Sequence, residues 1–244
     1  MKADAKPAAA PADADPTRGA LRVLREQSLN TLVRQEIERQ IVSGTVAAGA
    51  KLNEMDFSSA LGVSRGPVRE AFRALEQAGL VRTEKNRGVF VREISLEEAD
   101  EIYEVRAALE GMIGRLAAQR RTAAQLAGLR ALLKRMRAVS REREADAYLP
   151  LNLEFHDALA EAAGNAALAA NYRRVANELK LLRREMLRHD AENITRSTRE
   201  HEAIVEAIAD ADADTASRLL LEHALGSRDR LHRAREARAV GRAA

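Results

Sequence analysis

The sequence predicts a mainly α-helical protein with one small β-hairpin in its N-terminal part. Apolar residues recur with helical periodicity from residue 96 to about residue 235, which is typical of amphipathic helices. Ahead of that region, three shorter helical patterns are followed by two β-like runs around a turn signal. Hydrophobic residues make up 46% of the chain and aromatic residues only 3%, so we expect a core of aliphatic side chains.

The composition excludes several classes of protein. A chain of 244 residues is long enough for two modest domains. It contains no cysteine, which excludes disulfides, zinc ribbons, iron–sulfur clusters and cysteine nucleophiles. No apolar run approaches the roughly 20 residues that span a bilayer, and the first sixteen residues lack the apolar stretch of a secretory signal. We therefore expect a soluble, cytoplasmic protein without a membrane partner.

The first predicted domain covers residues 17–94, after a tail at 1–16 that is rich in Ala, Pro and Asp and is expected to be disordered. Apolar spacing and turn residues predict helices over 28–43, over 54–61 and from Ser64 to Gly79, then strands over 80–83 and 89–92. Ser64 is a good N-cap residue, and Pro67 falls in the first turn of the third helix, where a missing N–H costs nothing.

The second predicted domain covers residues 95–232 and is all helical. Its six predicted helices cover residues 96–120, 122–143, 145–163, 165–188, 194–209 and 212–232. The sequence Ser95-Leu96-Glu97-Glu98 resembles a capping box at the start of the first of them. Residues 233–244 are rich in Arg and Ala, and we expect them to be a frayed basic tail.

The first domain has the element order of a winged helix-turn-helix, in which two helices joined by a glycine-containing turn precede a β-hairpin. The second of those helices enters the major groove of DNA, and its N-terminal residues contact base edges. The candidate DNA-binding residues at that helix start and at the hairpin tip are Ser64, Arg65, Gly66, Arg69, Lys85, Asn86 and Arg87. Arg65 and Arg69 are four residues apart and share one helix face, and arginine is the usual bidentate partner of guanine.

The alternative interpretation of Arg65 and Arg69 is that they are solvated surface charges. The distribution of charge favours a nucleic-acid reader. Residues 17–94 carry 13 Lys and Arg against 9 Asp and Glu, whereas residues 95–230 carry 21 against 24. A mildly basic N-terminal domain is therefore joined to a mildly acidic larger one.

Residues 37–91 resemble the DNA-binding domain of GntR-type bacterial transcriptional regulators, most specifically in LGVSRGPVREAFRALEQAGLV and in the RGVFV of the hairpin. The stretches EVRAALEGMIGRLAA and NLEFHDALAEAAGN resemble the helical effector-binding FCD domain of the FadR branch. The resemblance implies that Arg65 and Arg69 bind an operator, helped by Ser64, Gly66 and the hairpin. Two departures are Ala48-Gly49, where Pro-Gly is common, and Met55, where some relatives carry a DNA-contacting arginine.

Three histidines, His156, His201 and His223, lie on apolar stripes of three different predicted helices. Each could be a core residue that hydrogen-bonds to a neighbour. Together with Asn152, one turn before His156, they favour a shared divalent cation. The resemblance implies the same set, because Asn152, His156, His201 and His223 fall where FCD domains place their metal ligands, although the first position is often Asp. Three nitrogen ligands and a weak oxygen suit Zn²⁺ or Ni²⁺.

Arg106 lies next to the apolar stripe of the first bundle helix, four residues before Glu110. One interpretation is an Arg–Glu pair on a solvated face. The other is that Arg106 points into the bundle and binds a carboxylate bidentately. The resemblance implies the second, since FCD domains bind an organic acid through an arginine at this motif position.

The hypothesis that follows is a transcriptional regulator that binds a palindromic operator as a homodimer and senses a small carboxylate in residues 95–232. Repression is the favoured sign of regulation, and activation is the alternative. One alternative is a DNA-binding protein whose helical bundle is purely structural. A metal-dependent enzyme is less favoured, because the sequence has no phosphate loop, HExxH motif or nucleophile elbow, and no general base is clearly placed. We therefore expect no enzyme activity.

Overall fold

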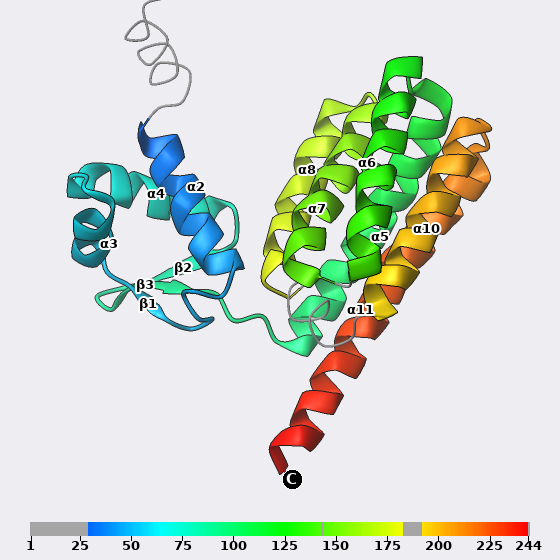
Figure 1. Cartoon of the computed structure of the whole chain (residues 1–244). Coiled ribbons are helices and arrows are strands. Elements are labelled where there is room, and N and C mark those ends of the chain that lie inside the picture. Colours follow the sequence, from blue (N-terminus) through cyan, green and yellow to red (C-terminus); the bar gives the residue numbers. More distant parts are fainter. Residues whose placement is uncertain (1–28, 143, 183–191, 244) are drawn as a thin grey trace, which may run out of the picture.

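The structure is a computed structural model and describes residues 29–142, 144–182 and 192–243, with side chains as far as residue 237. It consists of a small N-terminal domain and a larger helical bundle, joined by the segment after the third strand (Figure 1). The tail expected at residues 1–16 lies outside the described residues.

In its described part, from residue 29 onward, the N-terminal domain has three helices and a three-stranded sheet. Its elements are α2 (Leu29–Val42), β1 (Lys51–Leu52), α3 (Glu54–Leu61), α4 (Arg65–Gln77), β2 (Val81–Glu84) and β3 (Gly88–Val91). The apolar spacing on α2 and α4 accounts for its core, because Ile37 of α2 and Val68 and Leu75 of α4 are completely buried. Helix α3 begins at Asn53, whose side chain accepts a hydrogen bond from the backbone N–H of Met55, and ends at Gly62 in the left-handed conformation.

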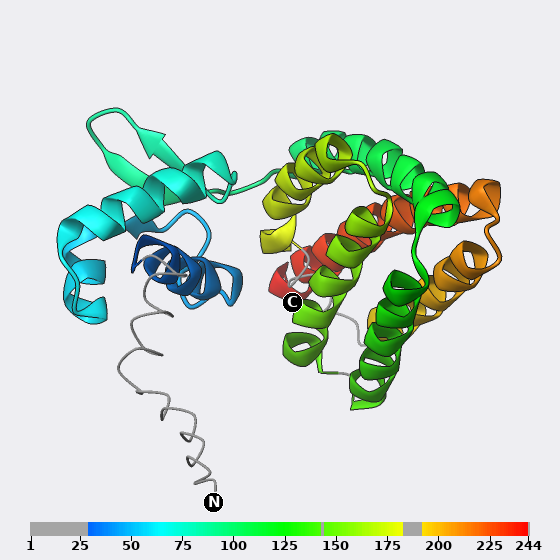
Figure 2. The same cartoon turned by 90° about the horizontal axis from the view of Figure 1, so that it is seen from above.

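The sheet corrects the expectation of a lone hairpin. Strand β1 pairs with β3 in antiparallel register, Lys51 opposite Phe90 and Leu52 opposite Val89, which gives the strand order β1-β3-β2. A two-residue strand is too short to show the alternation that predicts strands. The turn between β2 and β3 places Asn86 at φ 63° and Gly88 at φ 113°, and the hairpin projects from its domain (Figure 2).

The C-terminal bundle consists of α5 (Leu96–Arg120), α6 (Ala123–Glu142), α7 (Ala145–Ala162), α8 (Ala166–Glu178), α10 (Glu192–Ala209) and α11 (Ala213–Ala243). Ser95 caps α5 as expected, since its side chain accepts a hydrogen bond from the N–H of Glu98. The core is aliphatic, with Tyr148, Phe155 and Tyr172 as its buried aromatic residues in the main cluster.

Two helix ends differ from the prediction. Helix α8 ends at Glu178 instead of continuing to residue 188, because Leu179 interrupts it before a short helical segment at 180–182. Helix α11 continues to Ala243, so the segment expected to be a frayed tail is helical and extends beyond the bundle (Figure 1). Ala and Arg are among the strongest helix formers, and this segment is rich in both.

The two domains are tied together around the end of α8. Arg92, just after β3, donates hydrogen bonds to the carbonyl oxygen of Gly79 at 3.2 Å and to Oε2 of Glu178 at 2.9 Å, and it also pairs with Glu98. Lys180 Nζ lies 2.7 Å from Oε1 of Glu38 on α2. The end of α8 therefore contacts the segment that leads into α5, and the residues just after α8 contact α2.

Gly114 is required where α5 crosses α11. A Cβ atom at this position would lie 2.5 Å from the backbone oxygen of Ala216. We expect Gly114→Ala to lower the free energy of unfolding by about 1–3 kcal/mol, because one of the two helices must move. Thermal unfolding measures the effect. Gly128→Ala on α6 is the control, since no atom lies within 4 Å of the new Cβ, and it should stabilise by roughly 0.5–1 kcal/mol. Equal melting temperatures for the two variants would contradict the close helix crossing.

Candidate metal centre and nucleic-acid interface

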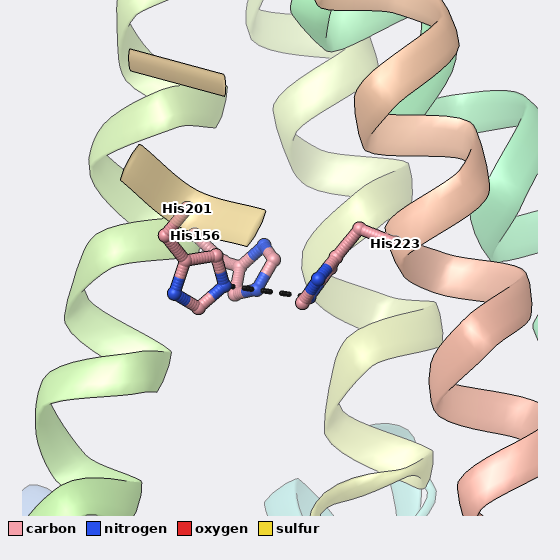
Figure 3. Close-up of side chains that lie close together, drawn as sticks. All are labelled: His156, His201 and His223. Atoms are coloured by element: carbon pink, nitrogen blue, oxygen red, sulfur yellow. Dashed lines mark hydrogen bonds between the residues drawn. The ribbon is translucent and has the colours of Figure 1, made fainter. Parts of the chain in front are cut away.

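Three buried histidines from three helices meet in the bundle core. His156 lies on α7, His201 on α10 and His223 on α11, and one ring nitrogen of each lies within 4.8 Å of those of the other two. The three side chains converge, and His201 Nε2 is 3.3 Å from His223 Nε2 (Figure 3). The apolar stripes predicted from the sequence therefore bring these three residues together.

Two of the histidines are oriented by carboxylates. His156 Nδ1 lies 3.1 Å from Oε1 of Glu110 on α5, and His223 Nδ1 lies 2.6 Å from Oε2 of Glu200 on α10. A carboxylate accepts, so each Nδ1 carries the donated hydrogen and each Nε2 keeps its lone pair. Metal-binding histidines are oriented by the same arrangement in known sites.

Each of these carboxylates is held by an arginine. Arg106 donates from Nε and Nη2 to Oε1 of Glu110 at 3.1 and 2.9 Å. Arg230 donates from Nη1 and Nη2 to the two oxygens of Glu200 at 2.9 and 3.2 Å. Two Arg–Glu–His chains thus approach the cluster from two directions. No sequence pattern marks Glu200 or Arg230, because their roles depend on contacts between α10 and α11.

The electrostatics of the cluster favour neutral imidazoles at His201 and His223. Burial lowers the pKa of His201 and of His223 well below its ordinary value, and the neighbouring histidine rings lower it further. Burial alone would raise the pKa of Glu110, but Arg106 and His156 hold it well below its ordinary value. A neutral imidazole is the form that binds a metal ion.

The residues present fit a divalent ion. His201 Nδ1 is buried and has no hydrogen-bond partner among the residues that the structure describes, a condition that buried polar atoms rarely tolerate. Three imidazole nitrogens are a donor set for Zn²⁺ or Ni²⁺. Asn152 is also buried on α7, one turn before His156. Whether its amide oxygen is a ligand stays a prediction.

Arg106 combines elements of both interpretations of the sequence. It pairs with Glu110, as the four-residue spacing predicts, but the pair does not lie on a solvated face, because each side chain is only 1% exposed. The guanidinium also lies over the ring of Tyr103, 5.5 Å from its centroid. Arg106 therefore points into the bundle, where Glu110 links it to His156.

The predicted DNA-contacting residues on α4 are all exposed. Ser64 occupies the N-cap position, but its side chain makes no capping hydrogen bond, contrary to expectation. Arg69 donates from Nε and Nη2 to the two oxygens of Glu54 on α3, at 3.0 and 2.9 Å. Arg65 Nε is 3.9 Å from the same carboxylate. Nothing in the spacing of Glu54 indicates this role, because its partners lie on another helix.

At the hairpin tip, Lys85, Asn86 and Arg87 are exposed between β2 and β3. Arg87 pairs with Glu84 of β2, and its guanidinium lies 5.6 Å from the ring centroid of Phe90. The tip thus presents two cations and an amide side chain on a short, well-formed turn. A contact of these residues with DNA stays a prediction.

The fold shows a helix-turn-helix domain joined to an all-helical domain whose core holds a histidine cluster. Residues 29–91 match the model of bacterial regulatory proteins of the gntR family, and residues 101–226 match the model of the FCD domain. The chain belongs to the GntR family of bacterial regulators and carries an FCD domain.

Proteins similar to this chain are transcriptional regulators by name. The probable D-xylose utilization operon transcriptional repressor of Paenarthrobacter nicotinovorans is 29% identical, with 82% of this chain and 87% of that protein aligned. The Nta operon transcriptional regulator of Aminobacter aminovorans is 32% identical, over 72% of this chain and 81% of that protein. These relatives place the chain among transcriptional regulators.

Solved structures share the fold. The Escherichia coli protein McbR/YncC superposes with a TM-score of 0.76 at 21% identity, over 84% of this chain and 98% of that one. A putative GntR regulator from Rhodococcus sp. RHA1 superposes with a TM-score of 0.67 at 28% identity, over 84% and 97%. Within the described residues, no helix is both long and apolar enough to span a membrane.

Proposed function

We propose that this chain is a metal-containing, carboxylate-responsive transcriptional repressor that binds a palindromic operator as a homodimer. The observation that carries the proposal is the pairing of a buried arginine with a buried histidine cluster: Arg106 is joined to His156 through a single oxygen of Glu110. Arg65 and Arg69 of α4 would bind the operator, helped by Ser64, Gly66 and the hairpin tip. The acid sensed in the bundle would alter their affinity for it.

His156, His201 and His223, with Asn152 beside them, would hold the metal ion. A bound divalent ion supplies a positive centre that attracts a carboxylate. The protein itself supplies the orientation, because Glu110 and Glu200 fix the rings of His156 and His223. An effector with a carboxylate then meets positive charge from both the ion and Arg106.

Arg106 is suited to bind a carboxylate effector because only one edge of its guanidinium is hydrogen-bonded to Glu110. Its Nε and Nη2 atoms both bind one oxygen of Glu110, on one edge of the planar guanidinium. The other edge, formed by Nη1 and the second hydrogen of Nη2, has the fork geometry that matches a carboxylate. A small organic acid is the class of ligand that this arrangement favours.

A homodimer is supported by an exposed apolar strip on the bundle. Val105 and Met112 on α5 are 52% and 48% exposed, and Leu221 on α11 is 38% exposed. These helices lie side by side, since a Cβ on Gly111 would lie 3.7 Å from Cβ of Leu221. Large apolar side chains gathered on one face are typical of protein interfaces. A two-fold dimer would match the symmetry of a palindromic operator.

A thermal-melt screen tests the sensing half of the proposal. The purified protein is loaded with Zn²⁺ or Ni²⁺, or treated with a chelator, and melted with a panel of small carboxylates. An acid at 100 times its dissociation constant stabilises by about 2.7 kcal/mol, which is several degrees for a protein of this size. We expect the shift only when the metal is present. The same acid should weaken operator binding about 5–150-fold. No shift from any acid in either state would contradict sensing and leave a DNA-binding protein with a structural bundle.

A further inference from the structure

Glu54 is the one carboxylate in the described residues with an ion pair to each of Arg65 and Arg69. It lies in the first turn of α3, on the element that precedes the recognition helix α4. Its two oxygens receive the Nε and Nη2 hydrogens of Arg69, which is the bidentate geometry of a strong Arg–carboxylate pair. These hydrogen bonds from Arg69 lower the pKa of Glu54 below its ordinary value, so the carboxylate is ionised at neutral pH.

The way Arg69 is held decides which of its donors remain for DNA. The edge with Nε and Nη2 is occupied by Glu54, which makes no hydrogen bond to the other edge, formed by Nη1 and the second hydrogen of Nη2. That second edge has the two parallel donors that guanine O6 and N7 accept in the major groove. A long arginine side chain that is already fixed loses less rotamer entropy when it binds.

The negative charge of Glu54 also favours operator binding over non-specific DNA binding. Arg65 and Arg69 are exposed, and two free guanidinium groups at a helix start would bind any DNA phosphate. A carboxylate between them repels phosphate and leaves less charge for non-specific contacts. Specificity rises when a site disfavours the wrong partner as well as fitting the right one.

We propose that Glu54 is a positioning residue for operator recognition: it fixes Arg69 in the base-reading orientation and suppresses non-specific phosphate binding by Arg65 and Arg69. This inference rests on the proposed function, in which α4 binds DNA. It adds that discrimination between operator and other DNA depends on a residue of α3 that need not contact DNA itself.

The experiment compares affinity for two duplexes. Wild-type full-length protein first selects an operator from random duplex DNA, and affinities for that operator and for a scrambled duplex are then measured across a salt series. We expect Glu54→Gln to reduce the ratio of the two affinities at least tenfold, with tighter binding to scrambled DNA. The slope of log affinity against log salt should steepen by about 0.9 for each additional phosphate that the variant neutralises. Failure of the wild-type protein to select any sequence would refute the proposed function, whereas an unchanged ratio in Glu54→Gln would refute only the role of Glu54.

Two further variants exclude an indirect effect. Glu70→Gln is the matched control, because Glu70 is an exposed carboxylate of α4 that pairs with Arg73 at 2.7 Å. The ratio of operator affinity to scrambled-DNA affinity in this variant should equal that of the wild type. A double-mutant cycle with Arg69→Ala tests the route of action. If Glu54 acts through Arg69, Glu54→Gln should change the ratio much less once Arg69 is absent. Full additivity of the two substitutions, or the same loss in Glu70→Gln, would overturn the proposal.

Discussion

Replacing His201 by alanine is expected to abolish stable metal binding by the helical domain. His201 contributes one of the three imidazoles that meet in the bundle core. Loss of a residue that only orients a metal ligand costs about 10–100-fold in affinity, so loss of a ligand should cost at least about 100-fold. Metal content after dialysis, measured by elemental analysis, should fall from one ion per chain to a trace.

The same variant should lose the stabilisation that the metal gives. An ion at 1,000 times its dissociation constant adds about 4.1 kcal/mol to the free energy of unfolding. Wild-type protein should therefore melt at a lower temperature after chelation, while His201→Ala should melt at the same temperature with and without chelator. His232→Ala is the matched control, because His232 lies outside the cluster and pairs with Asp100 at 2.7 Å. Wild-type metal content in His201→Ala would remove the proposed centre.

Arg65→Ala is expected to abolish specific operator binding and to leave the fold intact. Its side chain is 62% exposed and only 3.9 Å from the nearest carboxylate oxygen, so the pair contributes little to stability. A bidentate contact with a base is worth about 1–3 kcal/mol, and a homodimer would lose two of them. The operator affinity should fall much more than the affinity for scrambled DNA.

Arg73→Ala provides the comparison for this result. Arg73 is equally exposed on α4 but lies two turns beyond Arg65 and pairs with Glu70. Both variants should keep the wild-type melting temperature, and Arg73→Ala should keep most of the operator affinity. The measurement is fluorescence anisotropy with labelled operator at fixed salt. Normal operator binding by Arg65→Ala would show that the recognition helix is assigned wrongly.

The parts of the fold that follow from local chemistry were predictable. Helix α3 has the bounds that its apolar spacing and Gly62 predict, and α5 begins where Ser95 caps it. The convergence of the three histidines was predictable for the same reason, because each lies on the apolar stripe that a helix must bury. Apolar spacing did not predict β1, because its two residues carry no periodic signal. It also did not predict the end of α11, where residues with high helix propensity continue the helix beyond the apolar pattern.

The contacts made between helices were not predictable. Glu200 precedes His201 in the sequence, yet its carboxylate binds His223 and Arg230 on another helix. Glu54 reaches Arg69 across a separation of fifteen residues. No periodicity marks such partners, since they depend on how far two helices are shifted along each other. Sequence patterns therefore located the residues of the candidate sites better than their supporting carboxylates.

The connection between the two domains has a consequence for the thermodynamics of binding. Of the few residues between β3 and α5, Arg92 is held by Gly79 and Glu178, Ile94 is buried, and Ser95 caps the next helix. Such a segment has few accessible conformations left. The entropy of fixing the N-terminal domain is thus lost when the chain folds, and little of it is lost again on contact with DNA. An effector of the kind proposed above would therefore change DNA affinity by shifting one preferred orientation of the N-terminal domain, and not by ordering a flexible linker.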